Sequence, residues 1–267
     1  MIEMLEYGFI RTALGGTMAI GAVCAFLGVY VVLRRIVFVG ATLAQISSAG
    51  IALGILTGWS PSALSLAFTF LAVLFLAHPI VGARLPRDAT LGIAFTVSGA
   101  VAVLLVAHTA AGNEEVVHLV QGNLLAMTSA EARRLAIVFA VVLLVHLGFF
   151  KEFLYISFDP RMAITQGYRA ERWNLAFYLL LGLAIALAIK AIGILLMFAF
   201  LVVPAAVGLL VSRGLAATFV VAVGVAVVAV FLGIYFSYRF DFPSAPMIVT
   251  VLGGLLLVGA GYRRVVR

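Results

Sequence analysis

The chain has 267 residues, of which 65% are hydrophobic and only 10% are charged, and its mean hydropathy is +1.26. This composition excludes an ordinary soluble globular domain and predicts a polytopic membrane protein. The formal net charge of +7 requires no nucleic acid partner, because basic cytoplasmic loops beside anionic membrane lipid account for it.

Apolar runs bounded by charged residues or by Pro and Gly predict an all-α bundle of about eight or nine transmembrane helices in a single domain, residues 1–267. Each span needs about 20 apolar residues, because a helix pairs its own backbone groups where lipid offers no partner. The predicted spans cover residues 11–33, 40–57, 62–82, 89–109, 134–152, 173–190, 193–212, 215–236 and 245–262. Two points stay open: the break at Lys190 also fits one broken helix, and residues 112–131 also fit a half-helix beside Gly122.

Positive charge predicts the orientation, since loops rich in Lys and Arg stay in the cytoplasm. One predicted side carries the bases Arg34, Arg35, Arg84, Arg87, Lys151, Arg161, Arg169, Arg172, Arg213, Arg263, Arg264 and Arg267. The other side carries the acids Glu3, Glu6, Glu114, Glu115, Glu131 and Asp241. We therefore expect the N-terminus outside and the C-terminus inside, with no cleaved signal peptide because the start MIEMLEYG is acidic. Arg133 and Arg134 do not fit this pattern.

Catalytic motifs are missing from the sequence. Lys151 follows Phe150 and Lys190 follows Ile189, so neither lysine completes the phosphate-binding GxxxxGK[ST] loop. The four histidines lie on separate segments and form no HExxH zinc motif. We expect a chain that is not an enzyme and that holds no cofactor of its own.

A polar stretch, GATLAQISSAG, opens the second span at residues 40–50. Thr42, Gln45 and Ser48 recur every three residues, so a helix would place them in one polar stripe. Gly50 and Gly54 form a GxxxG pair on another face, which favours close helix contact.

Three further segments combine helix-breaking and polar residues. In FDPRMAITQG, Asp159 suits the cap, Pro160 the first turn and Gly167 the end of a short helix, which is either a docking element or a connector. Pro204 lies mid-span among small residues, which favours close packing over substrate contact. Asp241, at the outer end of a span, suits a cap of the following helix or a cation-attracting group.

Four stretches in this order and spacing resemble the membrane subunits of ABC transporters that import zinc, manganese or iron. They are RRIVFVGATLAQISSAGIALG, FDPRMAITQG, AIGILLMFAFLVVPAAVGLLV and GIYFSYRFDFPSAPMIV, and the resemblance runs from about residue 11 to 262. It implies an importer permease fold of the metal and cobalamin type, in a bacterial cytoplasmic membrane. It also implies a homodimer that works with a separate ATP-binding subunit and an extracytoplasmic substrate-binding protein.

The resemblance also implies roles for individual residues. Members present a coupling helix to the ATPase, matched here by Asp159, Pro160, Arg161, Ala163 and Gly167. The translocation pathway would include Ala41, Thr42, Gln45, Ser48 and Asp241. In the family the second span reads approximately GDALSHxxLxG, with an aspartate and a histidine for the passing cation, and those positions are Ala41 and Gln45 here.

This departure leaves the metal ligands unknown, because alanine offers no donor and a glutamine carbonyl is a weak neutral one. Three explanations remain: ligands from elsewhere, a chelated or different substrate, or dependence on a partner permease. A secondary transporter or channel is the alternative function, and it predicts buried ion-coupling acids that the sequence lacks. A membrane scaffold is another, and it would need no coupling helix.

Overall fold

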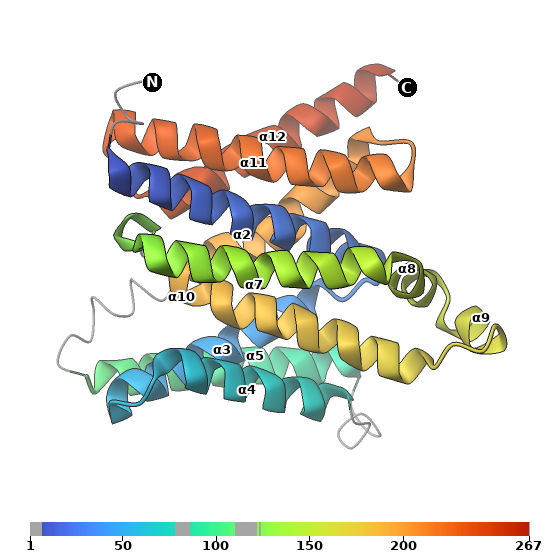
Figure 1. Ribbon diagram of the computed structural model, residues 1–267, viewed down its shortest axis with the longest axis horizontal. Helices are drawn as coiled ribbons and strands as arrows, with labels where there is room; N and C mark the ends of the chain where they lie inside the picture. The colour runs from blue at the N-terminus through green and yellow to red at the C-terminus, as the bar shows by residue number, and fades with distance from the viewer. Residues whose placement is uncertain (1–6, 78–85, 110–121, 123, 267) are drawn as a thin grey trace. The chain divides into compact units, whose positions relative to one another are not determined.

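The computed structural model describes residues 7–77, 86–109, 122 and 124–266, and every regular element within them is a helix (Figure 1). The elements in chain order are α2 (Gly8–Leu33), α3 (Val37–Thr57), α4 (Pro61–Ala77), α5 (Arg87–Ala107), η1 (Leu124–Ala126), α7 (Ser129–Gly148), α8 (Phe150–Phe158), α9 (Pro160–Thr165), α10 (Ala170–Val211), α11 (Leu215–Phe240) and α12 (Ser244–Val266). The predicted all-α fold is confirmed.

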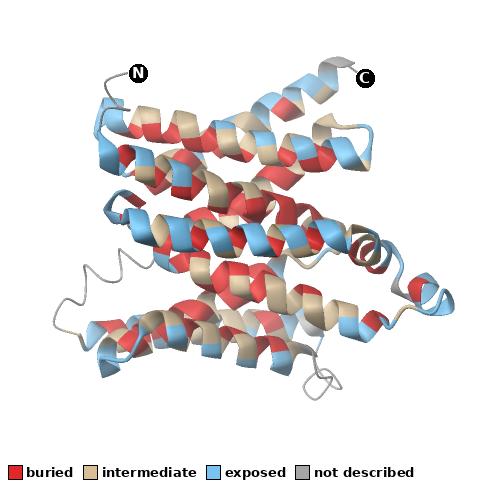
Figure 2. Cartoon of the chain, in the orientation of Figure 1, coloured by how far each residue is buried: buried red, intermediate tan, exposed pale blue. Residues whose placement is uncertain are grey.

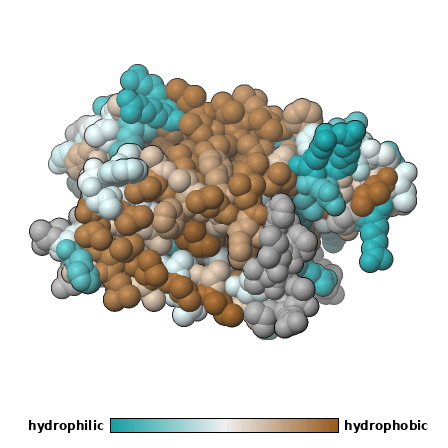
Figure 3. Space-filling view, turned by 90° about the horizontal axis from the view of Figure 1, so that it is seen from below, coloured by the Kyte–Doolittle hydropathy of each residue, from teal (hydrophilic) through white to brown (hydrophobic). Residues whose placement is uncertain are grey.

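Six of the described helices are long and apolar enough to cross a membrane, namely α2, α3, α5, α10, α11 and α12. Helix α4 has 17 residues, and α7 passes the same test only together with α8. Each predicted span lies on these helices over most of its length, and the sixth and seventh share α10. Large apolar side chains stay exposed on many of them, and hydrophobic residues dominate the face in Figure 3. Such surfaces suit contact with lipid.

The 42 residues of α10 are two helices joined at Gly193, where the backbone is non-helical with φ 77° and ψ 167°. The sequence analysis placed the break at Lys190, and the structure places it three residues later. Only glycine adopts this backbone conformation without a large steric cost. Gly122 packs against this point, since a Cβ on Gly122 would lie 2.3 Å from the carbonyl carbon of Ile192. Pro204, in contrast, lies buried within the second half of α10, whose only non-helical backbone is at Gly193.

The predicted span 134–152 is wrong at its end. Helix α7 stops at Gly148, and the chain turns by 72° into α8. Lys151 lies in the first turn of α8 and is exposed, so the bend takes a charged group off the line of the apolar span.

Several sequence predictions lie outside the described residues. They concern most of segment 112–131, the end of span 62–82, and the residues Glu3, Glu6, His78, Arg84, Glu114, Glu115, His118 and Arg267.

The chain divides into two compact units. Unit 1 comprises residues 1–35, 121–144 and 191–267, and unit 2 comprises residues 36–120 and 145–190. Each unit is built from segments distant in the sequence, so neither is a continuous half of the chain. That all 267 residues act as one membrane domain stays a prediction.

In unit 1, α11 packs against both α2 and α12. Helix α2 is mostly buried, with 72% of its most apolar stretch inside the protein, whereas the corresponding share for α12 is 22% (Figure 2). Gly28 of α2 lets the chain approach the second half of α10, because a Cβ there would lie 2.1 Å from the Leu201 carbonyl oxygen. The ring of Phe219 in α11 packs against those of Phe26 and Tyr30, with ring centroids 4.8 and 5.1 Å apart. Backbone contact at glycine and aromatic packing therefore hold this unit together.

In unit 2, α3 packs against α4 on one side and α5 on another. A Cβ on Gly50 would lie 2.7 Å from the Leu64 carbonyl oxygen, and one on Gly54 would lie 2.6 Å from Cα of Pro61. Both glycines thus face α4, and the predicted GxxxG contact is confirmed.

The contact at Gly28 gives a stability prediction. We expect Gly28→Ala to lower the free energy of unfolding by about 1–3 kcal/mol, because the new methyl group overlaps the backbone at Leu201. The matched control is Gly224→Ala in α11, where a Cβ meets nothing within 4 Å and the better helix propensity of alanine favours the folded state. Thermal unfolding in detergent measures both variants. Equal midpoints would contradict close packing at Gly28.

Candidate functional site

The polar stripe of α3 faces α5 within unit 2. Thr42 is buried, and its hydroxyl lies 2.9 Å from the carbonyl oxygen of Phe38 and 3.3 Å from that of Leu91 in α5. The half-buried Gln45 side chain packs against Gly99 of α5, where a Cβ would lie 3.3 Å from its Nε2. Thr42 and Gln45 therefore share one face of the helix, as the sequence spacing predicts.

Ser48 completes the stripe with bonds inside α3. Its hydroxyl donates to the carbonyl oxygen of Gln45 at 2.8 Å and lies 3.3 Å from Gln45 Oε1. The hydroxyls of Thr42 and Ser48 are thus satisfied by protein oxygens, which lowers the cost of burying them. The single donor of each hydroxyl is thus engaged, whereas the Gln45 amide carries two N–H donors and a carbonyl oxygen.

Ala41 lies one residue before the stripe and is also buried. It presents only a methyl group, so Ala41 and Gln45 together supply no carboxylate or imidazole. No group of three or more His, Cys, Asp or Glu side chains suited to a metal ion occurs among the described residues. The ligand set for a passing metal therefore stays open.

Ser47 of α3 forms a buried polar contact with the neighbouring helix α4, which the sequence analysis did not predict. Its hydroxyl lies 2.6 Å from that of Ser65 in α4, and Ser65 Oγ lies 3.3 Å from the carbonyl oxygen of Ala186 in α10. Both serines are buried and all three residues belong to unit 2. The residue spacing could have indicated this contact. Ser47, Gly50 and Gly54 are separated by three and four residues, so they share the helix face toward α4.

Helix α9 has the capping geometry that the sequence predicts. The Asp159 carboxylate accepts hydrogen bonds from the backbone N–H groups of Arg161 and Met162 at 2.9 and 3.0 Å. Pro160 occupies the first position, where no N–H is needed. Gly167 follows the helix in a left-handed conformation with φ 87°.

One face of α9 is anchored and the rest is exposed. Ala163 is buried in a small cluster with Ile156 of α8 and Ala170 of α10. Met162 and Ile164, on either side of it, are 60% and 59% exposed. Arg161 is exposed as well. The anchored helix therefore presents two large apolar side chains on its surface.

Asp241 occupies the end of α11 in a left-handed conformation, with φ 54° and ψ 40°. Its backbone N–H donates to the carbonyl oxygen of Ser237, so this residue ends α11, and a side-chain cap of the following helix stays a prediction. Ser237 also bonds to the hydroxyl of Ser244, where α12 begins, at 2.9 Å. The Asp241 side chain is exposed, which leaves its carboxylate accessible.

The Ser47 contact gives a second prediction. We expect Ser47→Ala to lower the free energy of unfolding by about 1 kcal/mol, because Ser65 loses a buried partner between helices. Ser48→Ala is the matched control, since both Ser48 bonds lie within α3 and a smaller loss is expected. Thermal unfolding of the two variants in one detergent decides the point. A larger loss for Ser48→Ala would show that the Ser47 contact does not stabilise unit 2.

The model of the ABC 3 transport family matches residues 6–262. Relatives include the manganese transport system membrane protein MntC of Listeria monocytogenes, which is 29% identical over 93% of this chain and 88% of that protein. The "Probable iron transport system membrane protein" of Haemophilus influenzae is also 29% identical, over 97% of this chain and 91% of that protein.

Among solved structures, PsaBC from Streptococcus pneumoniae in complex with Fab is similar, with a TM-score of 0.87 and 23% sequence identity. The alignment covers 99% of this chain and 97% of that one. At this identity the likeness supports the fold, and the family follows from the sequence match. Since that match takes in nearly the whole chain and the described helices are long and apolar, this multi-pass membrane protein belongs to the ABC 3 transport family.

Proposed function

We propose that this chain is the permease subunit of an ABC-type importer and forms the translocation pathway for a divalent metal ion such as manganese, iron or zinc. The family match over residues 6–262 is the observation that carries the proposal. Relatives of nearly the same length are named for manganese and iron transport. The chain would act as a homodimer in a bacterial cytoplasmic membrane, and an extracytoplasmic binding protein would deliver the cargo.

Energy for transport would come from a separate ATPase subunit that binds ATP. Neither lysine of this chain follows a glycine, so the chain has no phosphate-binding loop of the GxxxxGK[ST] type. Helix α9 would dock to the ATPase, because Met162 and Ile164 are exposed apolar side chains on a helix fixed by Asp159 and Ala163. Apolar anchors of this kind dominate the binding energy of small interfaces.

The orientation follows from the docking role of α9. Exposed basic residues flank α9 on both sides, with Lys151 in α8 and Arg169 and Arg172 at the start of α10. A cytoplasmic position for these residues agrees with the distribution of Lys and Arg in membrane proteins. The N-terminus would then face outward and the C-terminus inward.

The polar stripe of α3 would line the pathway, with Asp241 at its outer mouth. Ala41, Thr42, Gln45 and Ser48 carry no charge, so the cargo would meet neutral oxygen and amide groups there. Neutral donors hold a bare transition metal weakly. This observation favours a second candidate, a chelated metal or another substrate that needs no charged ligand.

Gln45 tests the role of the stripe. We expect Gln45→Ala to reduce metal uptake severalfold, because it removes the only amide of the stripe, with its carbonyl oxygen and two N–H donors. Thr57→Ala is the control. Thr57 lies exposed at the end of the same helix, and its hydroxyl donates to the carbonyl oxygen of Leu53 within that helix. Uptake per folded transporter is the measurement. Equal uptake by the two variants would make the stripe a packing feature.

Helix α9 tests the proposed function as a whole. The chain, its ATPase and its binding protein are expressed in a bacterium that lacks its own manganese and iron importers, and growth under chelator and cellular metal content are measured. We expect wild type to restore both, and the double variant Met162→Asp/Ile164→Asp to restore neither because it no longer retains the ATPase on purification.

The control for this experiment is Arg213→Asn, a change in the exposed turn between α10 and α11. It should behave as wild type in growth, metal content and ATPase retention. Full growth with the double variant would contradict the docking role of α9. No gain in metal by wild type would contradict metal import.

A further inference from the structure

The start of α2 and the end of α11 carry one exposed arginine each, Arg11 and Arg239. The two helices pack against each other in unit 1 and have 26 residues apiece, which makes each about 39 Å long. The hydrocarbon core of a bilayer is about 30 Å thick, so a helix of this length centred in it extends about 4–5 Å beyond the core at each end. Arg11 is the fourth residue of α2, and Arg239 is the last but one of α11. Both therefore lie where the hydrocarbon gives way to the lipid head groups.

Exposed aromatic rings join these two helix ends. The ring centroid of Tyr7, the residue before α2, lies 5.8 Å from that of Phe9 and 6.3 Å from that of Tyr238 in the last turn of α11. All three rings are about half exposed. Tyrosine is enriched at membrane interfaces, because its ring sits at the level of the head groups while its hydroxyl meets water. The rings thus support the depth that the helix lengths give to the two arginines.

Arg11 belongs to the part of α2 that meets α11. Its backbone N–H donates to the Tyr7 carbonyl oxygen at 3.2 Å, so Arg11 lies one helical turn after the residue whose ring contacts Tyr238. Arg239 directly follows Tyr238 in the chain. The contact between the two tyrosines therefore places both arginines at the same end of unit 1.

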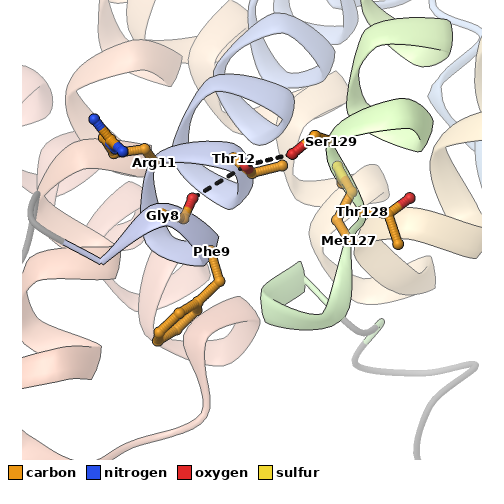
Figure 4. Close-up of a pocket in the computed structure, with 7 residues that line it drawn as sticks. All are labelled: Gly8, Phe9, Arg11, Thr12, Met127, Thr128 and Ser129. Carbon is orange, nitrogen blue, oxygen red and sulfur yellow. Dashed lines mark hydrogen bonds between the residues drawn. The ribbon is translucent and has the colours of Figure 1, made fainter.

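A pocket of about 610 Å³ lies beside Arg11, between the start of α2 and residues 127–129 (Figure 4). Two of its hydroxyl groups are bonded within the protein, since Thr12 Oγ1 lies 3.1 Å from the Gly8 carbonyl oxygen and 3.3 Å from Ser129 Oγ. In Figure 4 the Arg11 side chain points away from this bonded pair. Arg11 is thus the lining residue that offers charged donors to a group outside the protein.

We propose that Arg11 and Arg239 bind the phosphate group of an anionic phospholipid, for example phosphatidylglycerol, at this end of α2 and α11. A guanidinium presents a planar fork of N–H donors that matches two phosphate oxygens. The acyl chains would stay in the hydrocarbon core, so the protein needs to supply only the head-group contact. The inference requires that α2 and α11 span a membrane, and it does not depend on the cargo, on the partner subunits or on which membrane face carries this end.

The surrounding charge favours a lipid as the occupant. Arg133 and Arg134 are further exposed bases near the start of α7, whose first residue, Ser129, bonds to Thr12 at this end of α2. In the proposed orientation these bases face outward, against the usual distribution of Lys and Arg. An anionic phospholipid would offset such charge, and any bilayer that contains it holds its phosphate at the depth of Arg11.

The test measures lipid binding to the full chain. The chain is taken from nanodiscs that contain equal amounts of phosphatidylglycerol and phosphatidylcholine, and the phospholipids it retains in mild detergent are identified by native mass spectrometry. Affinity is then measured by adding either lipid to the delipidated chain and following its thermal midpoint. We expect wild type to prefer phosphatidylglycerol. Arg11→Gln and Arg239→Gln should each weaken that binding by about fivefold, and the double variant by about twentyfold.

Two variants serve as controls. Arg213→Gln changes an exposed arginine just before α11, at the opposite membrane face, and should leave the affinity unchanged. Asp241→Asn removes an exposed carboxylate two residues after Arg239 and should strengthen the binding. Without added lipid, Arg11→Gln should unfold at the wild-type midpoint, because the residue is exposed and only its contact with lipid is lost.

Three outcomes would overturn the proposal. One is equal affinity for phosphatidylglycerol in wild type and in the double variant Arg11→Gln/Arg239→Gln, even if the double variant weakens contact with a protein partner. Another is a wild type that binds both lipids equally. The third is displacement of the lipid by millimolar inorganic phosphate, since the site would then hold a free anion. None of these outcomes bears on metal gain by wild type in the growth experiment, which tests the proposed function separately.

Discussion

Contact between helix backbones at glycine is the interaction on which the rest of this structure depends. Lipid tails are as apolar as the side chains of the spans, so the hydrophobic effect gives little drive for one helix to bind another inside a membrane. Close approach supplies dispersion energy instead, and it occurs where Gly28 meets Leu201, Gly50 meets Leu64 and Gly54 meets Pro61. These contacts set where each helix lies within its unit and therefore which side chains face one another.

The placement of polar groups follows from this packing. Because Gly50 and Gly54 hold one face of α3 against α4, the stripe that contains Thr42 and Gln45 turns toward α5. Ser47, on the glycine face, is drawn into a buried contact with Ser65. The same helix thus carries one set of hydroxyls that joins it to its neighbours and one amide, on Gln45, that packs against Gly99.

Much of this arrangement is predictable from the sequence where a local pattern decides it. Apolar runs predict the helices, the GxxxG spacing predicts a close helix contact, which the structure shows to be with α4, and the order Asp159, Pro160 and Gly167 predicts both ends of α9. The break in α10 was displaced to Gly193 because a glycine in an apolar run is compatible with a helix or with a bend, and its packing against Gly122 decides between them. The role of Ser47 could not be predicted from the sequence, because it depends on the position of Ser65 in another helix. The capping of α11 by Asp241 likewise depends on the turn that brings Ser237 to Ser244.

Energy would enter this importer through α9, and the cargo would meet the neutral groups of the α3 stripe. In the proposed function, ATP hydrolysis on a partner subunit drives a metal through this chain. Uptake by proteoliposomes that contain the chain and its ATPase tests it most directly, with binding protein and free or chelated manganese, iron or zinc added outside and ATP enclosed. We expect the metal to accumulate against its gradient only when the ATPase can hydrolyse ATP. Accumulation without ATP, or no accumulation of any metal in either form, would contradict it.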